Sequence, residues 1–313
     1  MTTILLGPQR FTTTVPPVVR SLGVDGPIIM VTSGWEEREA QDGELAGHLD
    51  GRGVNLRLYQ RAVEILAADS AMRAAVREYR GRRAELRAFY AIRLRDAEEA
   101  LHAVRHRSDL YGLAPSADRA AMQALRDVDD WYAFEAARIV RETAASKVFT
   151  ASEELARHRS EVADLLGSAA VVLLAGGHVG ILMETLRLFE VTLPAQVPVV
   201  AWSAGAMAVC DWVVLFHDFM PHGVTTPEVH DHGMARLRGI IALPHARRRL
   251  HLEDRARMAA LAERFPMHRM LPLDDGTIVR FAGPISDSTG RDEPPVGARF
   301  LGTDGTLGTW GAA

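Results

Sequence analysis

Short apolar runs that each end in small turn residues constrain the fold of this chain more than any other feature. Residues 3–6 form the first run and residues 27–31 the second, and a stretch with helix character, residues 15–22, lies between them. Strands that alternate with helices in this order pack side by side as a parallel sheet. The N-terminal part, with a third strand predicted at residues 54–58, therefore indicates an α/β fold.

The alternating pattern then stops and a long helical segment follows. Apolar residues recur near heptad spacing over residues 86–104 and again over residues 122–139, among many Arg and Glu residues. A turn at residues 111–116 separates the two stretches, with Ser116 as a candidate helix cap. The pattern predicts a helical hairpin within an insertion at 59–165. It is either a solvated helix pair, a homodimer surface, or a lid over a substrate.

The strand pattern resumes after the insertion. Thr150 and Glu153 have the spacing of a capping box and predict a helix start there. The later elements are a helix at 250–265 and strands at 169–174, 197–200, 213–216, 237–243, 277–281, 298–301 and 308–310, the last two around Asp304-Gly305. We therefore predict one α/β domain over residues 1–313, a three-layer sandwich with a mostly parallel central sheet.

Composition excludes several classes of function. The chain has 313 residues and a formal net charge of -4, which does not favour nucleic-acid binding. No apolar run approaches the roughly 18 residues that a membrane helix needs, and the first residues lack the basic segment of a secretion signal. The single cysteine, Cys210, excludes an internal disulfide and fits a reducing compartment. We expect a cytoplasmic protein without a nucleic-acid or membrane partner.

The segment around Ser203 is the strongest indication of chemistry. An apolar strand ends in Trp202-Ser203-Ala204-Gly205, and a helix pattern begins immediately afterwards. A serine on a sharp turn between a strand and a helix has the geometry of a nucleophile elbow, which exposes the hydroxyl. Ser203 is therefore a candidate nucleophile, and it needs a base, an orienting acid and oxyanion donors.

Candidates for the base and the acid follow later in the chain. His245 ends a predicted strand, as the serine does, and ligands of open α/β sheets bind at the carboxyl ends of strands. Asp274 and Asp275 precede a strand and offer the acid, although Asp-Asp-Gly is also an ordinary turn sequence. Three alternative acids lie between the serine and the histidine: Asp211, Asp218 and Asp231.

Glycines and arginines supply candidate binding groups. Gly176 and Gly177 follow a strand and precede a helix, so their backbone N–H groups can turn toward a ligand. The N–H of Ala204 would be the partner oxyanion donor. Arg248 and Arg249, just after the histidine, either form a charged helix face or offer bidentate anchors for a substrate carboxylate.

A cluster of histidines raises the question of a metal site. The four residues are His217, His222, His230 and His232. Their spacing is irregular and no cysteine joins them, which is unlike the ligand sets of zinc sites. We expect a polar loop that borders the cleft, and no metal or cofactor.

Three stretches resemble the aspartyl dipeptidase and cyanophycinase serine peptidases, whose fold is like that of class I glutamine amidotransferases. They are Leu174-Ala175-Gly176-Gly177-His178, Trp202-Ser203-Ala204-Gly205-Ala206, and Pro244-His245 with the arginines that follow. Residues 271–277 resemble a fourth motif, an acidic pair before a strand. The order serine, histidine, acid also differs from the order serine, acid, histidine of the α/β-hydrolases.

The resemblance implies a nucleophile at Ser203, a general base at His245 and an orienting acid at Asp275. It implies oxyanion donors from the Gly177 and Ala204 backbones. It covers residues 1–58 and 166–313, outside the helical insertion.

The chain departs from the family pattern at three positions. Ala201 stands where the family usually has Gly, His178 replaces an Asn or Asp near the substrate, and Asp275 is one methylene shorter than the usual Glu. A preference for aspartyl groups is therefore not carried over. Gln9 and Trp35, which follow the first two strands, are further candidates for substrate contacts.

We predict a serine hydrolase that cleaves an amide bond in a small peptide or isopeptide. Ser203 attacks the carbonyl, His245 takes the hydroxyl proton and passes it to the leaving amine, and two backbone N–H groups hold the oxyanion. The alternative is a non-catalytic protein of the same fold that binds a ligand or a partner through the insertion. An esterase that uses the same residues is a third hypothesis.

Overall fold

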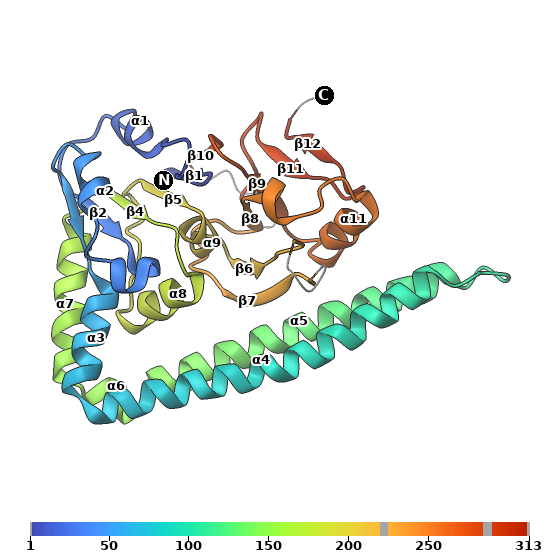
Figure 1. Ribbon diagram of the computed structural model, residues 1–313, viewed down its shortest axis with the longest axis horizontal. Coiled ribbons are helices and arrows are strands. Elements are labelled where there is room, and N and C mark those ends of the chain that lie inside the picture. The colour runs from blue at the N-terminus through green and yellow to red at the C-terminus, as the bar shows by residue number, and fades with distance from the viewer. Residues whose placement is uncertain (1, 220–224, 284–289, 312–313) are drawn as a thin grey trace.

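The protein is built around a six-stranded sheet, seen in a computed structural model that describes residues 2–219, 225–283 and 290–311. The strand order is β10-β1-β5-β4-β2-β3 (Figure 1). The parallel strands are β1 (Thr2–Leu6), β2 (Ile28–Val31), β3 (Gly53–Asn55), β4 (Val171–Leu174) and β5 (Val199–Trp202), and the edge strand β10 (Ile278–Ala282) is antiparallel to β1. The predicted mixed α/β fold with a mostly parallel central sheet is confirmed.

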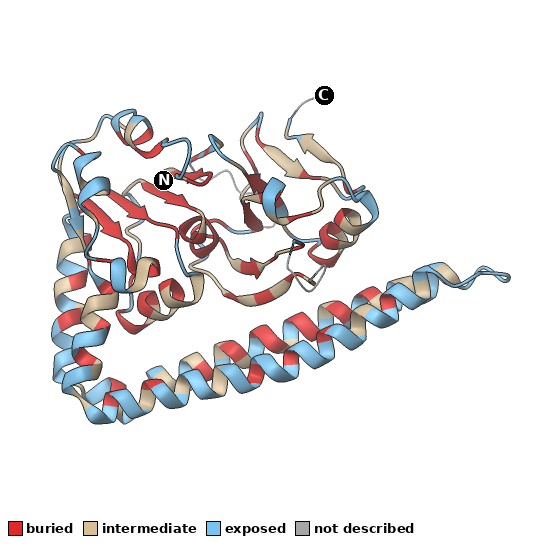
Figure 2. Ribbon diagram, viewed as in Figure 1, coloured by how far each residue is buried: buried red, intermediate tan, exposed pale blue. Residues whose placement is uncertain are grey.

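Alternate residues of the central strands face opposite sides of this sheet, as the two-residue period of a strand requires. In β4, Val172 and Leu174 belong to the core cluster on one side. Val171 and Leu173 belong to the cluster on the other side. All four are buried, as Figure 2 shows for the central strands, and this explains the uninterrupted apolar run in the sequence.

Helices cover both faces of the sheet and complete three layers. On one face lie α1 (Val15–Arg20) and α2 (Gly43–Gly47). The other face carries α3 (Leu58–Ala68), α7 (Glu153–Gly167), α8 (Val179–Leu188) and α9 (Ala204–Val209). A short 3-10 helix, η1 (Ser33–Arg38), follows β2.

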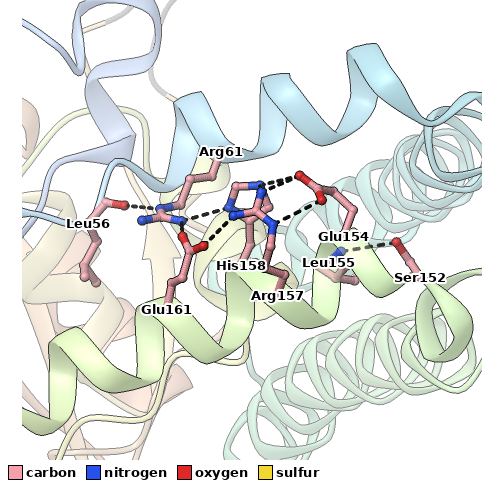
Figure 3. Close-up of polar contacts among 8 residues, drawn as sticks. All are labelled: Leu56, Arg61, Ser152, Glu154, Leu155, Arg157, His158 and Glu161. Atoms are coloured by element: carbon pink, nitrogen blue, oxygen red, sulfur yellow. Dashed lines mark hydrogen bonds and ion pairs between the residues drawn. The ribbon is translucent and has the colours of Figure 1, made fainter.

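A polar network joins α3 to α7 (Figure 3). Arg61 of α3 donates to the Leu56 carbonyl at 2.9 Å and to Glu161 of α7 at 2.5 Å. Its guanidinium also contacts Nδ1 of the buried His158 at 2.8 Å. The network fixes the two helices that flank the start and the end of the hairpin.

The start of α7 differs from the sequence prediction. Ser152, and not Thr150, caps this helix, because its hydroxyl accepts a hydrogen bond from the Leu155 N–H at 3.3 Å. Thr150 lies in α6 (Lys147–Ala151) and donates to the Ser146 carbonyl. The capping box predicted at Thr150 is therefore wrong.

The predicted helical hairpin is present as α4 (Ser70–Arg105) and α5 (Ala114–Ala144), which lie side by side along their length (Figure 1). The ring of Tyr90 stacks on Tyr132 with centroids 4.2 Å apart. Ser116 lies inside α5 and does not cap it, so that prediction is wrong. Asp109 accepts the N–H groups of Leu113 and Ala114 instead.

Buried ion pairs hold the hairpin against the rest of the molecule. Asp129 of α5 pairs with Arg264 at 2.6 Å, and both side chains are 3% exposed. Asp231 accepts from Arg83 of α4 and from Arg187 of α8. Two separate sets of ion pairs, one at Asp129 and one at Asp231, therefore hold the hairpin against the body. Among the helices of the described residues, none is long and apolar enough to cross a membrane.

A second, four-stranded sheet has the order β12-β11-β9-β8. Its strands are β8 (Ile240–Pro244), β9 (Arg269–Leu273), β11 (Arg299–Leu301) and β12 (Leu307–Thr309), and β8 and β9 pair in parallel. The predicted closing hairpin is confirmed as β11 and β12. β9 was not predicted, because Pro272 within it is unusual for a paired strand.

The remaining elements of the second half are short. β6 (Trp212–Leu215) and β7 (Glu228–His232) form an antiparallel pair against the hairpin. The helix predicted at residues 250–265 is shorter and is preceded by a second one: α10 (Ala246–Arg249) and α11 (Arg255–Arg264) are separated by a loop, and Asp254 caps α11.

Candidate active site

Ser203 lies on a sharp turn between β5 and α9, with φ 49° and ψ -119°. Non-glycine residues rarely adopt a positive φ, and such strain is common at active sites. Small neighbours make the turn fit: a Cβ added at Gly205 would lie 2.2 Å from the Leu174 carbonyl oxygen. Ala201 stays within β5. The strand, turn and helix of a nucleophile elbow are therefore present.

Gly176 and Gly177 follow β4, the parallel neighbour of β5. A Cβ on Gly176 would lie 2.9 Å from the Ser203 Cβ, so this glycine lets the loop pass directly beside the serine. Gly177 has φ 120°, and a Cβ there would lie 2.2 Å from the Gly34 carbonyl oxygen. Only glycine fits at either position.

Two backbone N–H groups border the serine turn. No backbone hydrogen bond uses the Gly177 N–H in the described part of the chain. Ala204 is the first residue of α9, so its N–H has no acceptor within the helix. His178 fixes the loop, because its N–H donates to the Gly34 carbonyl at 2.7 Å and its Nδ1 accepts from the Ile181 N–H. In the described chain, the Gly177 and Ala204 N–H groups therefore both lack a backbone acceptor.

His245 follows β8 in a left-handed conformation, with φ 58° and ψ 34°. Its backbone N–H donates to the Leu273 carbonyl at 3.0 Å, which ties it to β9. Burial lowers the pKa of its imidazole, and the nearby charge of Arg249 lowers it further, whereas Asp275 raises it. A neutral imidazole is the form that accepts a proton.

The acidic pair lies next to β1, which is the strand beside β5. A Cβ on Gly7 would lie 1.8 Å from the Asp274 carbonyl oxygen. Asp274 accepts the Arg247 N–H at 2.9 Å, whereas Asp275 acts electrostatically on the imidazole of His245. In the chain as described, no hydrogen bond joins Ser203 to His245 or His245 to Asp275. His245 and the two acids therefore line one cleft, in which Ser203 is not a lining residue, and no hydrogen bond closes a triad in the described chain.

The three alternative acids are engaged elsewhere. Asp211 accepts the Gly239 N–H at 2.8 Å. Asp218 pairs with Arg257 at 2.7 Å. Asp231 is the buried acid that joins α4 to α8. These three acids are therefore occupied by other partners. The acids that act on His245 are Asp274 and Asp275, which follow β9.

An open cleft surrounds His245. Its lining combines cationic, acidic and aromatic side chains: Arg10, Phe11, His217, Phe219, Arg247, Arg248, Arg249, Asp274 and Asp275. Burial lowers the pKa of the Arg249 guanidinium, and the adjacent Arg248 lowers it further. Sequence reasoning missed Phe11 and Phe219, which are 73% and 48% exposed. An aromatic residue in the loop that follows the first strand was the available signal for Phe11.

Two predicted substrate contacts have other roles. The side-chain amide of Gln9 donates to the Gly7 carbonyl and accepts the Thr14 N–H at 2.7 Å, so it shapes the loop before α1. Trp35 packs, partly buried, against the apolar cluster on the α1 side of the sheet.

The histidines do not gather around a common point. His217 lines the cleft, and His232 packs edge-on against Trp212. Burial lowers the pKa of His230 to about 4. His222 lies outside the described residues. Over 2–219, 225–283 and 290–311, no group of three or more His, Cys, Asp or Glu side chains is arranged to hold a metal ion.

Comparison with known proteins assigns no family to this chain. No family model matches the chain, and no curated protein matches it. A solved structure described as a peptidase from an acI-B1 Actinobacterium is similar over 90% of this chain and 82% of that chain, with 12% identity and a TM-score of 0.42. So distant a likeness assigns neither a fold family nor an activity to this chain.

Proposed function

We propose that the protein is a serine hydrolase that cleaves an amide bond in a small peptide or isopeptide, with Ser203 as the nucleophile. The observation that carries the proposal is the strained backbone of Ser203 between a parallel strand and a helix. Strain of this kind costs about 1–3 kcal/mol and persists where the surrounding structure enforces it. The close approach of Gly176 and Gly205 provides that enforcement.

In the proposed mechanism, Ser203 Oγ attacks the amide carbonyl while His245 accepts its proton. The N–H groups of Gly177 and Ala204 stabilise the oxyanion of the tetrahedral intermediate. His245 then protonates the leaving amine, and water hydrolyses the acyl-enzyme by the same steps in reverse. Asp275 favours the imidazolium that forms in between. The mechanism needs no metal or cofactor.

The arginines of the cleft favour a substrate that carries a carboxylate. Arg249 is half-buried beside His245, and none of its side-chain atoms has a hydrogen-bond or ion-pair partner among the described residues. A guanidinium without a protein partner can bind a carboxylate through two parallel hydrogen bonds. Phe11 and Phe219 add apolar surface to the same cleft.

The proposed architecture follows the resemblance to the aspartyl dipeptidase and cyanophycinase peptidases. The chain is then a single domain with a fold like that of class I glutamine amidotransferases, interrupted by the insertion at residues 59–165. The serine, histidine and acid occur in the order of that family, and each follows or precedes a strand.

A non-catalytic binding protein is the second candidate. The absence of a hydrogen bond between Ser203 and His245 in the described chain favours it. Catalytic hydrogen bonds are, however, often long before substrate binds, so the same observation is compatible with an enzyme.

Turnover of a peptide panel separates the two candidates. The panel contains α-linked and isopeptide-linked dipeptides, each with a free or an amidated C-terminal carboxylate. We expect the wild-type protein to hydrolyse members with a free carboxylate, and Ser203→Ala to lose at least about 10³-fold of the rate. Arg249→Gln should raise KM for these members more than it lowers kcat. Binding of a panel member without any turnover would support the second candidate.

A further inference from the structure

One face of α5 carries a regular row of exposed side chains that the proposed catalytic site does not use. Its residues are Asp127, Asp130, Phe134, Arg138 and Arg141, which we call the α5 stripe. Relative to Phe134 they lie four and seven positions away on either side, and these spacings place residues on one face of a helix. Phe134 at the centre is 61% exposed.

The α5 stripe faces away from the body of the protein. The side of α5 that contacts the body is marked by Asp129, which pairs with Arg264, and by Tyr132, whose hydroxyl donates to the His230 carbonyl. At 100° per residue, Phe134 is rotated by about 140° from Asp129 around the helix axis. The α5 stripe is therefore open to a partner.

The charges of the α5 stripe are ordered. The two acids lie on the side of Phe134 nearer the hairpin tip, and the two arginines lie on the side nearer the hairpin base. In the described ranges, Asp130 and Arg141 have no hydrogen-bond or ion-pair partner for their side chains, whereas Arg138 pairs with Glu135 and Glu142 of its own helix. Burial and the neighbouring Asp129 and Asp127 raise the pKa of Asp130, whereas His232 lowers it.

The charge pattern of the α5 stripe is complementary to that of a second copy that runs in the opposite direction. Across a twofold axis at Phe134, an antiparallel copy places Arg138 opposite Asp130 and Arg141 opposite Asp127, while the two phenylalanine rings meet at the axis. A parallel copy would instead place like charges opposite each other. Twofold symmetric dimers require this kind of self-complementary surface.

We infer that the α5 stripe is the contact surface for a second copy of this chain, which binds antiparallel about a twofold axis at Phe134. The contact is one helix face on another, so it is smaller than the roughly 1,600 Å² of a standard interface. Its charged pairs are exposed, and added salt should weaken them. The dimer does not involve Ser203, so the inference is independent of the proposed function.

Sedimentation velocity of the full chain over a concentration series tests the dimer. Phe134→Glu should raise the dimer dissociation constant at least about tenfold, as expected for the central residue of an interface. Phe89→Glu is the matched control, because Phe89 is 55% exposed on α4 of the same hairpin but lies outside the α5 stripe. A wild-type protein that stays monomeric, or a dimer that Phe134→Glu leaves intact, would overturn the inference.

Charge reversal and crosslinking test the antiparallel arrangement. Arg141→Glu should weaken the dimer, and the addition of Asp127→Arg should restore it. The only native cysteine, Cys210, is buried, so introduced cysteines can be oxidised selectively. Phe134→Cys should form a disulfide with the same residue of the second copy. In a mixture of the two variants, Asp127→Cys should crosslink with Arg141→Cys. Crosslinking of Asp127→Cys with its own copy would contradict the antiparallel register.

Discussion

At the scale of single residues, the candidate site depends on glycines that let backbones approach Ser203. Gly176 passes beside its Cβ, and Gly205 lies against the Leu174 carbonyl. These contacts allow a serine to hold a positive φ that costs about 1–3 kcal/mol. The same contacts leave no space for a methyl group.

Gly205→Ala tests this requirement. The added Cβ would lie 2.2 Å from the Leu174 carbonyl oxygen, so the backbone of the turn must move. We expect a loss of about 1–3 kcal/mol in the free energy of unfolding, the usual cost of overpacking. Urea denaturation measures it. Gly81→Ala is the control: it lies inside α4 with no neighbouring atom within 4 Å and should stabilise by about 0.5–1 kcal/mol. Equal effects of the two substitutions would contradict the account.

The pH dependence of the reaction tests the role of His245. Its imidazole accepts a proton only when it is neutral, and burial lowers its pKa. The rate should therefore rise with pH through a midpoint below the ordinary value of about 6.5 and remain high above it. Arg249→Gln removes a positive neighbour, so the pKa of His245 and this midpoint should move to higher pH. The measurement is kcat/KM against pH. A midpoint that stays in place would argue against His245 as the base.

At the scale of elements, the hairpin of α4 and α5 is attached by buried charge. Asp129 accepts from Arg264, and both side chains are almost fully buried. The hydroxyl of Tyr90 on α4 also donates to Asp129. The pair thus ties both helices of the hairpin to α11, which is difficult to reconcile with a lid that opens freely.

Asp129→Asn should destabilise the protein strongly, because it removes the negative charge that is hydrogen-bonded to the buried guanidinium of Arg264. Removal of one partner from a buried pair costs about 3–5 kcal/mol. Asp50→Asn removes one partner of the exposed pair with Arg20 and should change stability by less than about 1 kcal/mol. Denaturant unfolding of both variants gives the comparison. A small effect of Asp129→Asn would show that the hairpin is held mainly by apolar contacts.

The sequence predicted the central strands well because each is buried on both faces and appears as an apolar run. It failed where an element depends on long-range pairing. β9 contains Pro272 and pairs with β8 and β11, so its identity as a strand comes from its partners. The caps of two helices were also predicted at the wrong residues. Ser152 caps α7, and Asp109 accepts the first N–H group of α5.

The turn at Ser203 was predictable because its small residues are local in sequence. The surroundings of His245 were not, since β8 belongs to the second sheet and packs on α9, the helix that follows the serine turn. The ion pair of Asp218 with Arg257 was not predictable either, because it joins segments that are distant in sequence. The role of Gln9 within its own loop depends on loop geometry, which the sequence pattern does not show.

At the scale of the whole molecule, the candidate site lies where two sheets meet. Ser203 follows a strand of the six-stranded sheet, and His245 follows a strand of the four-stranded sheet. Asp274 and Asp275 connect the two, because they follow β9 and precede β10. The distance between nucleophile and base therefore depends on how the two sheets pack.

Labelling with a fluorophosphonate probe tests the central claim most directly, because the probe reacts only with a serine that its surroundings activate. We expect the wild-type protein to gain one phosphonyl group, located on Ser203 by peptide mass spectrometry. Ser203→Ala should remain unlabelled, and His245→Gln should react far more slowly. A folded wild-type protein without labelling, or labelling that persists in Ser203→Ala, would contradict the account.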